Sequence, residues 1–209
     1  MLLHYFYDPL CSWCYGFSPI IMAFQEKYKS EMDFEIISGG MVKGEGERPI
    51  GDLAHFLKDA RKRIEDTSGV KFGPRFIDLM EEGTTVFSSI PGAVALSVFK
   101  SFDEEKAISY ASDIQYAIYY DGIDPNNEEA YAQLASKYEI SVDEFLSRMG
   151  QDAYRKDAYD DFSVAQQFGI KGYPSTVLFA KDEYFLLNRG FTKLENLEKT
   201  LKSVKSSIK

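Results

Sequence analysis

The sequence predicts an α/β fold in which a β-α-β unit and a β-β-α unit build one sheet around a large helical insertion. Residues 1–40 alternate strand, helix and strand patterns, residues 41–169 show almost only helical periodicity, and strand patterns return after residue 170. Neither flanking unit buries enough apolar surface alone to offset chain entropy. We therefore expect residues 1–40 and 170–209 to form one discontinuous domain, with residues 41–169 inserted as a helical domain.

The first unit opens with an apolar run over residues 2–7 that predicts a strand. A helix follows, because apolar residues recur on one helical face at Phe17, Ile21, Phe24 and Tyr28. Residues 33–37 then alternate as a half-buried strand does, and two glycines, Gly39 and Gly40, end that strand.

The insertion is predicted to hold several helices. Apolar stripes at helical spacing mark them within residues 53–64, 93–99, 107–118, 131–138 and 158–165. Ser141 and Glu144 form a capping-box pair, which predicts the start of a further short helix. Gly169 is placed to end the last helix of the insertion.

The last unit contains two apolar runs, residues 175–179 and 184–187, separated by a hairpin-length segment, Lys181-Asp182-Glu183. Thr192 and Glu195 form a second capping-box pair, which predicts the start of a final helix. That helix carries an apolar stripe at Leu194, Leu197, Leu201 and Val204.

Composition and charge exclude several classes of function. The net charge is −9, and fifteen acidic but only five basic residues lie between Asp103 and Asp161. No basic face is present for nucleic acid, and no apolar stretch approaches the ~20 residues that span a membrane. No Lys or Arg precedes Lys27 and no signal-peptide pattern is present, so a cytoplasmic protein is expected. The acidic block is predicted to be a solvated helical surface, with an electrostatic filter for basic partners as the alternative.

Cys11 and Cys14, the only cysteines, sit where the first strand gives way to the first helix. A helix N-terminus offers unpaired N–H groups and a partial positive charge, which favour the reactive thiolate. Two intervening residues allow the pair to close a disulfide. A structural zinc site would need about four ligands, and only His4 and His55 could join the cysteines. We therefore predict a redox-active pair, with no metal and no organic cofactor.

Two motifs resemble a known family. The Cys-Ser-Trp-Cys segment, with Pro19 five residues beyond it, and the Gly-Tyr-Pro-Ser-Thr segment at residues 172–176 resemble the thioredoxin fold. The helical insertion between the two units is similar to that of the DsbA family. With Asp8 three residues ahead of Cys11, the first motif is most similar to the FrnE-like branch of that family.

The resemblance implies a thiol–disulfide oxidoreductase that acts on protein or glutathione-like thiols and disulfides through a mixed disulfide. Cys11 would be the exposed nucleophile and Cys14 the buried resolving thiol. Pro174 would be the cis-proline that lies against the dithiol in this fold, and Tyr173 before it would bind a peptide by strand addition. Ser12 and Trp13, between the cysteines, are predicted to face the substrate.

One position departs from the family pattern. Many thioredoxin-like enzymes keep a buried carboxylate six residues before the first cysteine, where this chain has Tyr5. The relay is therefore absent, or His4 or water replaces it. Asp8 and Pro9 are predicted to form a turn into the helix, with a modest electrostatic role for Asp8 as the alternative.

Two other functions remain open from the sequence. The same arrangement resembles kappa-class glutathione transferases and related isomerases, which typically carry Ser near the first cysteine position. A groove that holds unfolded peptides independently of redox state is the third hypothesis. The sequence predicts neither the direction of exchange nor the oligomeric state.

Overall fold

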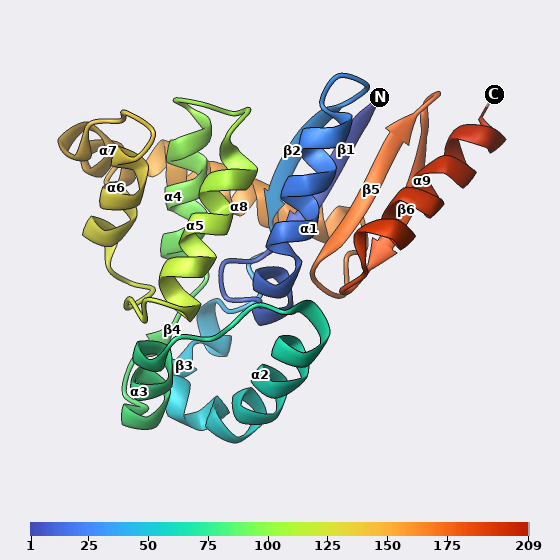
Figure 1. Ribbon diagram of the computed structural model, residues 1–209. Helices are drawn as coiled ribbons and strands as arrows, with labels where there is room; N and C mark the ends of the chain where they lie inside the picture. The colour runs from blue at the N-terminus through green and yellow to red at the C-terminus, as the bar shows by residue number, and fades with distance from the viewer. Residues whose placement is uncertain (209) are drawn as a thin grey trace.

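The computed structural model describes residues 1–208, and both flanking units contribute to one four-stranded sheet, as predicted. The strand order is β2-β1-β5-β6 (Figure 1). Strand β1 (Leu2–Tyr7) pairs in parallel with β2 (Asp33–Ser38) and antiparallel with β5 (Ser175–Ala180). Strand β6 (Glu183–Arg189) completes the sheet at the far edge.

The register of β1 determines which loops meet at one end of the sheet. Phe6 lies opposite Ser175 on β5, and Tyr7 lies opposite Ser38 on β2. The loop after β1 therefore emerges beside the segment that enters β5 and the segment that leaves β2. These three segments carry the two motifs singled out in the sequence.

Helices cover both faces of the sheet. Helix α1 (Ser12–Tyr28) and helix α9 (Leu194–Ser207) pack side by side on one face (Figure 1). The predicted stripe of α1 is buried there, from Phe17 to Tyr28. On the other face, Ala165 of α8 (Asp152–Gln167) packs against Phe6 and Ile37.

The insertion is mainly helical. Its helices before α8 are α2 (Ala54–Ser68), α3 (Pro74–Glu82), α4 (Ile90–Lys100), α5 (Ala107–Tyr119), α6 (Glu128–Ser136) and α7 (Val142–Met149). Helix α5 packs against α1 on one face of the sheet, and α8, against which α4 packs, lies on β2 on the other face, so the insertion contacts the sheet unit on both sides. Within the described residues, none of these helices combines the length and the apolar character needed to cross a membrane.

The insertion also contains elements that periodicity did not predict, among them helix α3. Two short 3-10 helices, Gly44–Gly46 and Ile50–Leu53, precede α2. A two-residue strand, β3 (Arg48–Pro49), pairs with β4 (Val86–Phe87). Strands of two residues are too short to show an alternating sequence pattern. Their pairing also depends on how the chain between them folds, which no local pattern reveals.

Two of the predicted helix ends are confirmed. The Ser141 side chain accepts from the Glu144 N–H at 3.4 Å, and Gly169 ends α8 with a φ of 65°. The expected capping box of the last helix was wrong: Lys193, not Thr192, is the N-cap, and no side chain caps it. The hairpin turn is also shorter than expected, because β6 already begins at Glu183.

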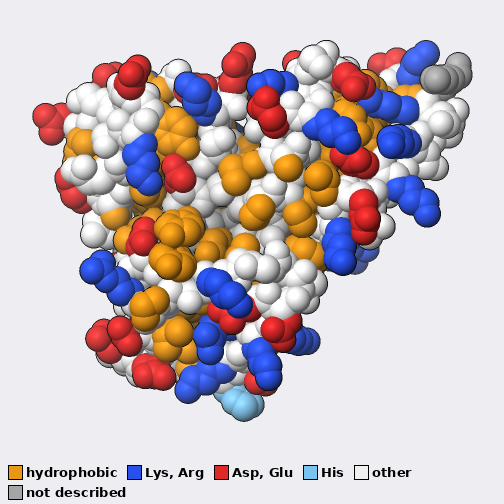
Figure 2. Space-filling view, viewed as in Figure 1, with side chains coloured by type: hydrophobic (Ala, Val, Ile, Leu, Met, Phe, Trp, Pro, Cys, Tyr) orange, Lys and Arg blue, Asp and Glu red, His pale blue; other side chains and the backbone are white. Residues whose placement is uncertain are grey.

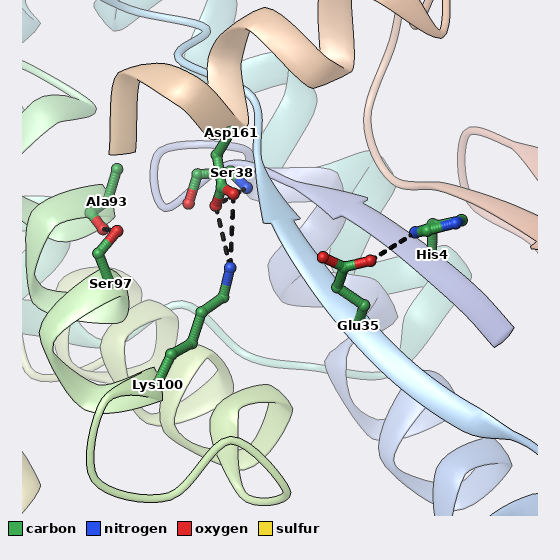
Figure 3. A network of polar contacts seen from close by, with 7 residues as sticks. All are labelled: His4, Glu35, Ser38, Ala93, Ser97, Lys100 and Asp161. Atoms are coloured by element: carbon green, nitrogen blue, oxygen red, sulfur yellow. Dashed lines mark hydrogen bonds and ion pairs between the residues drawn. The ribbon is translucent and has the colours of Figure 1, made fainter. Parts of the chain in front are cut away.

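A polar contact ties the insertion to the edge of the sheet (Figure 3). Asp161 of α8 accepts from the Ser38 N–H at 3.0 Å and pairs with Lys100 of α4 at 3.1 Å. The same figure shows His4 of β1 paired with Glu35 of β2, with 2.8 Å between Nδ1 and Oε2. The first contact holds α4 and α8 against β2, close to the end of the sheet where the motifs lie.

Candidate active site

The two cysteines occupy the first turn of α1, as their spacing predicted. Cys11 is the N-cap residue, with φ −87° and ψ 102°, and its Sγ accepts from the Cys14 N–H at 3.2 Å. Both side chains are free thiols and both are buried, Cys14 completely and Cys11 with 5% of its surface exposed, so the expectation of an exposed Cys11 is wrong for this structure. The helix start therefore directs a hydrogen-bond donor at one sulfur and leaves the other enclosed.

This enclosure makes the two thiols chemically different. Burial raises the pKa of the Cys14 thiol well above its usual value, and the neighbouring Cys11 raises it further. Cys11 lies at the positive end of the helix, where N–H groups and the helix dipole favour an anion. The geometry thus suits Cys11 as the attacking sulfur and Cys14 as the resolving thiol, which stays protonated until the second step.

The second motif lies beside the first. The Tyr173–Pro174 peptide bond is cis, and the Pro174 carbonyl accepts from the Gly190 N–H at 2.7 Å. The Tyr173 hydroxyl donates to the Gly39 carbonyl at 3.1 Å. Gly39 has to be glycine here, because a Cβ would lie 2.1 Å from the Tyr173 ring.

The register of β1 against β5, with Phe6 opposite Ser175, brings Tyr173 to the end of the sheet where β1 leads into the dithiol. Burial raises the pKa of Tyr173 to about 12, and the charges of Asp8 and the two cysteines add to this shift. Segments more than 150 residues apart in the printed sequence are therefore neighbours at this end of the sheet.

Asp8 proves to be a buried carboxylate with three hydrogen-bond donors. Its oxygens accept from the Leu10 N–H at 2.9 Å, the Met41 N–H at 2.6 Å and the Ser89 hydroxyl at 2.8 Å. Burial raises its pKa to about 6, although these hydrogen bonds act in the opposite direction. The turn role expected for Asp8 is therefore only part of its role, because it joins the turn before α1 to the segment after β2 and to the start of α4.

The position of the missing relay carboxylate is filled by an aromatic ring. The Tyr5 hydroxyl is buried and has no hydrogen-bond partner within residues 1–208. Burial raises the pKa of Tyr5, and the next contribution comes from Cys14, which places this hydroxyl beside the enclosed sulfur. His4 lies on the opposite face of β1, paired with Glu35 and packed against Phe168, and so does not face the dithiol.

The residues between the cysteines lie at the surface of the site. Ser12 and Trp13 are both half-buried, and the Trp13 ring lies 5.8 Å from the Phe191 ring. The start of α1 lies near the middle of the view in Figure 1, and Figure 2 shows hydrophobic side chains gathered near the middle of the same face with charged side chains around them. Trp13 is therefore both packed and accessible.

Gln115 is a site residue that the sequence analysis did not identify. It lies on the buried face of α5, and its Nε2 donates to the Asp8 carbonyl at 3.0 Å. Its one sequence signal is a polar residue interrupting the apolar stripe between Ile114 and Ile118.

No three His, Cys, Asp or Glu side chains in the described part of the chain are grouped so as to hold a metal ion. His55, the other histidine considered as a ligand, is exposed on α2. The site chemistry therefore has to be argued from the two sulfurs and the groups around them.

Comparisons with known proteins agree with this geometry. A family described as the DSBA-like thioredoxin domain matches residues 3–202. The cytosolic disulfide reductase DsbM from Pseudomonas aeruginosa is 25% identical, with 99% of each chain covered and a TM-score of 0.82. Its structure with GSH is also similar, at 25% identity and a TM-score of 0.79, covering 99% of this chain and 100% of that chain.

A more distant structure has the same fold. A 2-hydroxychromene-2-carboxylate isomerase is 16% identical, covers 100% of this chain and 96% of its own, and has a TM-score of 0.66. At this identity the likeness concerns the fold alone. The search of curated proteins gave no match.

Proposed function

Since the chain belongs to the DSBA-like thioredoxin domain family, we propose that it is a thiol–disulfide oxidoreductase that uses Cys11 and Cys14. The observation that carries this proposal is the asymmetry of the pair. Cys11 Sγ accepts an N–H from the helix start, while Cys14 is fully enclosed one turn along.

The proposed reaction is stepwise exchange. The Cys11 thiolate attacks one sulfur of a substrate disulfide, the substrate S–S bond breaks, and the other substrate sulfur leaves as a thiolate. The Cys14 thiol then loses its proton and attacks Cys11 Sγ, which releases the second substrate sulfur. The substrate gains two electrons, and the Cys11–Cys14 dithiol becomes a disulfide. Two thiols such as glutathione then restore the dithiol: the first attacks the Cys11–Cys14 disulfide and forms a mixed disulfide, and the second attacks that mixed disulfide and leaves joined to the first as a disulfide.

Substrate contacts are assigned to the residues around the sulfurs. Trp13 and Ser12 lie at the surface of the turn, and Tyr173 with Pro174 forms the adjacent wall. The backbone before Pro174 would pair with an extended substrate segment, as in strand addition. We propose thiols or disulfides of proteins or of glutathione type as substrates, and the likeness to DsbM, including its structure with GSH, supports this choice.

The same likeness supports a cytosolic place of action, since the Pseudomonas neighbour is described as cytosolic. A reducing compartment would favour reduction of substrate disulfides with glutathione as the restoring thiol. We therefore propose reductase activity as the main direction.

The test uses single-cysteine variants in an insulin reduction assay with glutathione. Cys11→Ser should abolish turnover, because no sulfur remains to attack the substrate. Cys14→Ser should accumulate mixed disulfides, visible by mass spectrometry, because nothing resolves them. Full turnover by Cys11→Ser would reject the proposal.

Two further arms separate the other hypotheses. Conjugating or isomerising activity with glutathione that survives alkylation of both thiols would indicate the transferase-like function instead. Suppression of aggregation that is equal in wild type and in the Cys11→Ser/Cys14→Ser double variant, without exchange activity, would indicate a peptide-binding chaperone.

A further inference from the structure

We infer that Gln115 is a positioning residue that links the helical insertion to the Cys11–Cys14 turn and stabilises its dithiol form. This inference deepens the proposed function, because it concerns what tunes the proposed redox pair. It starts from an unusual feature of α5. Among the buried residues of that helix, Gln115 alone carries a side-chain amide, and it is only 1% exposed.

The amide is satisfied entirely by the segment that carries the cysteines. Its Nε2 donates to the Asp8 carbonyl at 3.0 Å and approaches the Cys11 carbonyl at 3.4 Å. Its Oε1 accepts from the Ser18 hydroxyl at 2.8 Å. Carbonyl oxygens can only accept, so the NH₂ group must face them, which fixes the orientation of the amide.

Ser18 extends this contact to the second cysteine. Its hydroxyl lies 3.2 Å from the Cys14 carbonyl as well as 2.8 Å from Gln115. One side chain from the insertion thus contacts the backbone before the first cysteine, the backbone of that cysteine and, through Ser18, the backbone of the second. Burying an amide is costly unless it is hydrogen-bonded, so an apolar residue would suit this helix face better if packing alone mattered.

The contacts favour the reduced, thiolate-bearing turn on electrostatic grounds. The Asp8 and Cys11 carbonyl oxygens carry partial negative charge close to Cys11, where negative charge develops in the thiolate. The Gln115 NH₂ group offsets that charge in a buried site, where water does not screen it. Without it the thiolate is less stable, so the disulfide form gains relative to the dithiol.

The experiment measures the equilibrium of the enzyme dithiol with glutathione buffers, read by Trp13 fluorescence. Gln115→Met keeps the length of the side chain but removes both donor and acceptor. We expect the equilibrium constant for reduction of the enzyme disulfide to fall about tenfold, equivalent to a potential about 30 mV more negative. Alkylation of Cys11 by iodoacetamide at pH 7 should slow in the same variant.

Controls separate positioning from simple stability. Gln133→Met makes the same chemical change on the exposed face of α6 and should leave both readings unchanged. Ser18→Ala removes only one hydroxyl and should shift the equilibrium in the same direction, about twofold to threefold; it serves as the deciding variant if Gln115→Met does not fold. A lowered melting temperature with an unchanged glutathione equilibrium in the folded variants would overturn the inference.

The glutathione equilibrium and the alkylation rate both report on the protein's own dithiol. If the wild type did not reduce insulin, the proposed function would be rejected, but the comparison of Gln115→Met with wild type would still hold. Unchanged equilibria in the variants, with normal activity in the wild type, would reject the positioning role alone.

Discussion

The surroundings of Asp8 in the fold are the hardest to predict from its neighbours in the sequence. A carboxylate before a proline is an ordinary turn residue, yet here it is fully buried and accepts from the turn before α1, from the segment after β2 and from the start of α4. Those donors lie up to 81 residues away, so no local pattern could have identified them. Its raised pKa follows directly from that burial.

The raised pKa predicts how stability depends on pH. Folding raises the pKa of Asp8 from 3.8 to about 6, so the folded state favours the protonated form. This contribution to stability is complete below about pH 4 and is lost as pH rises through about 6, a change of about 3 kcal/mol. Urea unfolding of wild type and Asp8→Asn at several pH values measures it, because the variant cannot ionise at this position.

We expect wild type to lose stability relative to Asp8→Asn between pH 4 and 7. A constant offset from the lost Met41 hydrogen bond should remain at every pH, since an Asn NH₂ cannot accept that N–H. Parallel pH profiles for the two proteins would contradict the burial argument.

Whether a site residue could be predicted depends on how far along the sequence its contacts lie. Cys11 and Cys14 were predictable because their roles follow from two-residue spacing at a strand-to-helix junction. Gln115 was not, because its partners lie 97 to 107 residues away and a single polar residue in an apolar stripe has many ordinary explanations. The catalytic and substrate-contact roles remain predictions until the cysteine variants are measured.

At the scale of elements, most helices were found from their periodicity or their caps, whereas α3 was not predicted from the sequence. Helix α7 begins at the predicted Ser141 cap, whereas α9 begins after Lys193 without a side-chain cap. In α9 burial of Leu197 and Leu201 evidently suffices to define the helix. The short β3–β4 pair escaped prediction because its two strands are brought together by the packing of α3 and the loop around residue 50.

The β5–β6 hairpin offers a test of turn strain. Lys181 and Asp182 both have positive φ, 55° and 62°, which is the backbone of a two-residue turn that favours Asn-Gly. Residues with a Cβ are less stable in that conformation, by about 1 kcal/mol each. Lys181→Asn/Asp182→Gly should therefore raise the free energy of unfolding by about 1 kcal/mol, measured by urea denaturation. A decrease would show that these side chains stabilise the hairpin by contacts of their own.

The tie between α8 and the sheet edge predicts a second change at this scale. Lys100 is the partner of Asp161, and both side chains are more than four-fifths buried. Lys100→Met would leave the carboxylate without its counter-charge and should destabilise the protein by about 2 kcal/mol.

The matched control is Lys156→Met, which removes the lysine of the exposed Lys156–Asp160 pair on the same helix, α8. Because water screens exposed pairs, no measurable change is expected. Equal effects of the two substitutions in thermal denaturation would contradict the importance of burial for the Lys100 contact.

Across the whole molecule, the two halves of the sheet had to combine because neither could be stable alone, and this was predictable from chain length and pattern. The observed order β2-β1-β5-β6 bears this out. The boundaries at residues 40 and 170 between a sheet domain and a helical domain stay a prediction. Limited proteolysis addresses them, since independent domains would be cut first near those positions.

The uneven charge of the molecule predicts how fast it reacts with charged substrates. The net charge is −9, and the block from Asp103 to Asp161 is strongly acidic. Helix α5 of that block packs directly against α1, which carries the dithiol; α5 itself holds one carboxylate, Asp113, and Asp121 follows its end. A negative field around the site should repel anionic disulfides and attract cationic ones, and salt should weaken both effects because the screening length falls to about 10 Å at 0.1 M.

We therefore expect the rate of reaction with oxidised glutathione to rise severalfold between 10 and about 300 mM salt, and the rate with cystamine, a cationic disulfide, to fall. Stopped-flow Trp13 fluorescence with the two disulfides measures these rates on one protein, so differences in folding cannot contribute. If both rates changed in the same direction with salt, the acidic block would be a solvated helical surface without influence on substrate choice, because only a field of one sign at the sulfur separates the two disulfides.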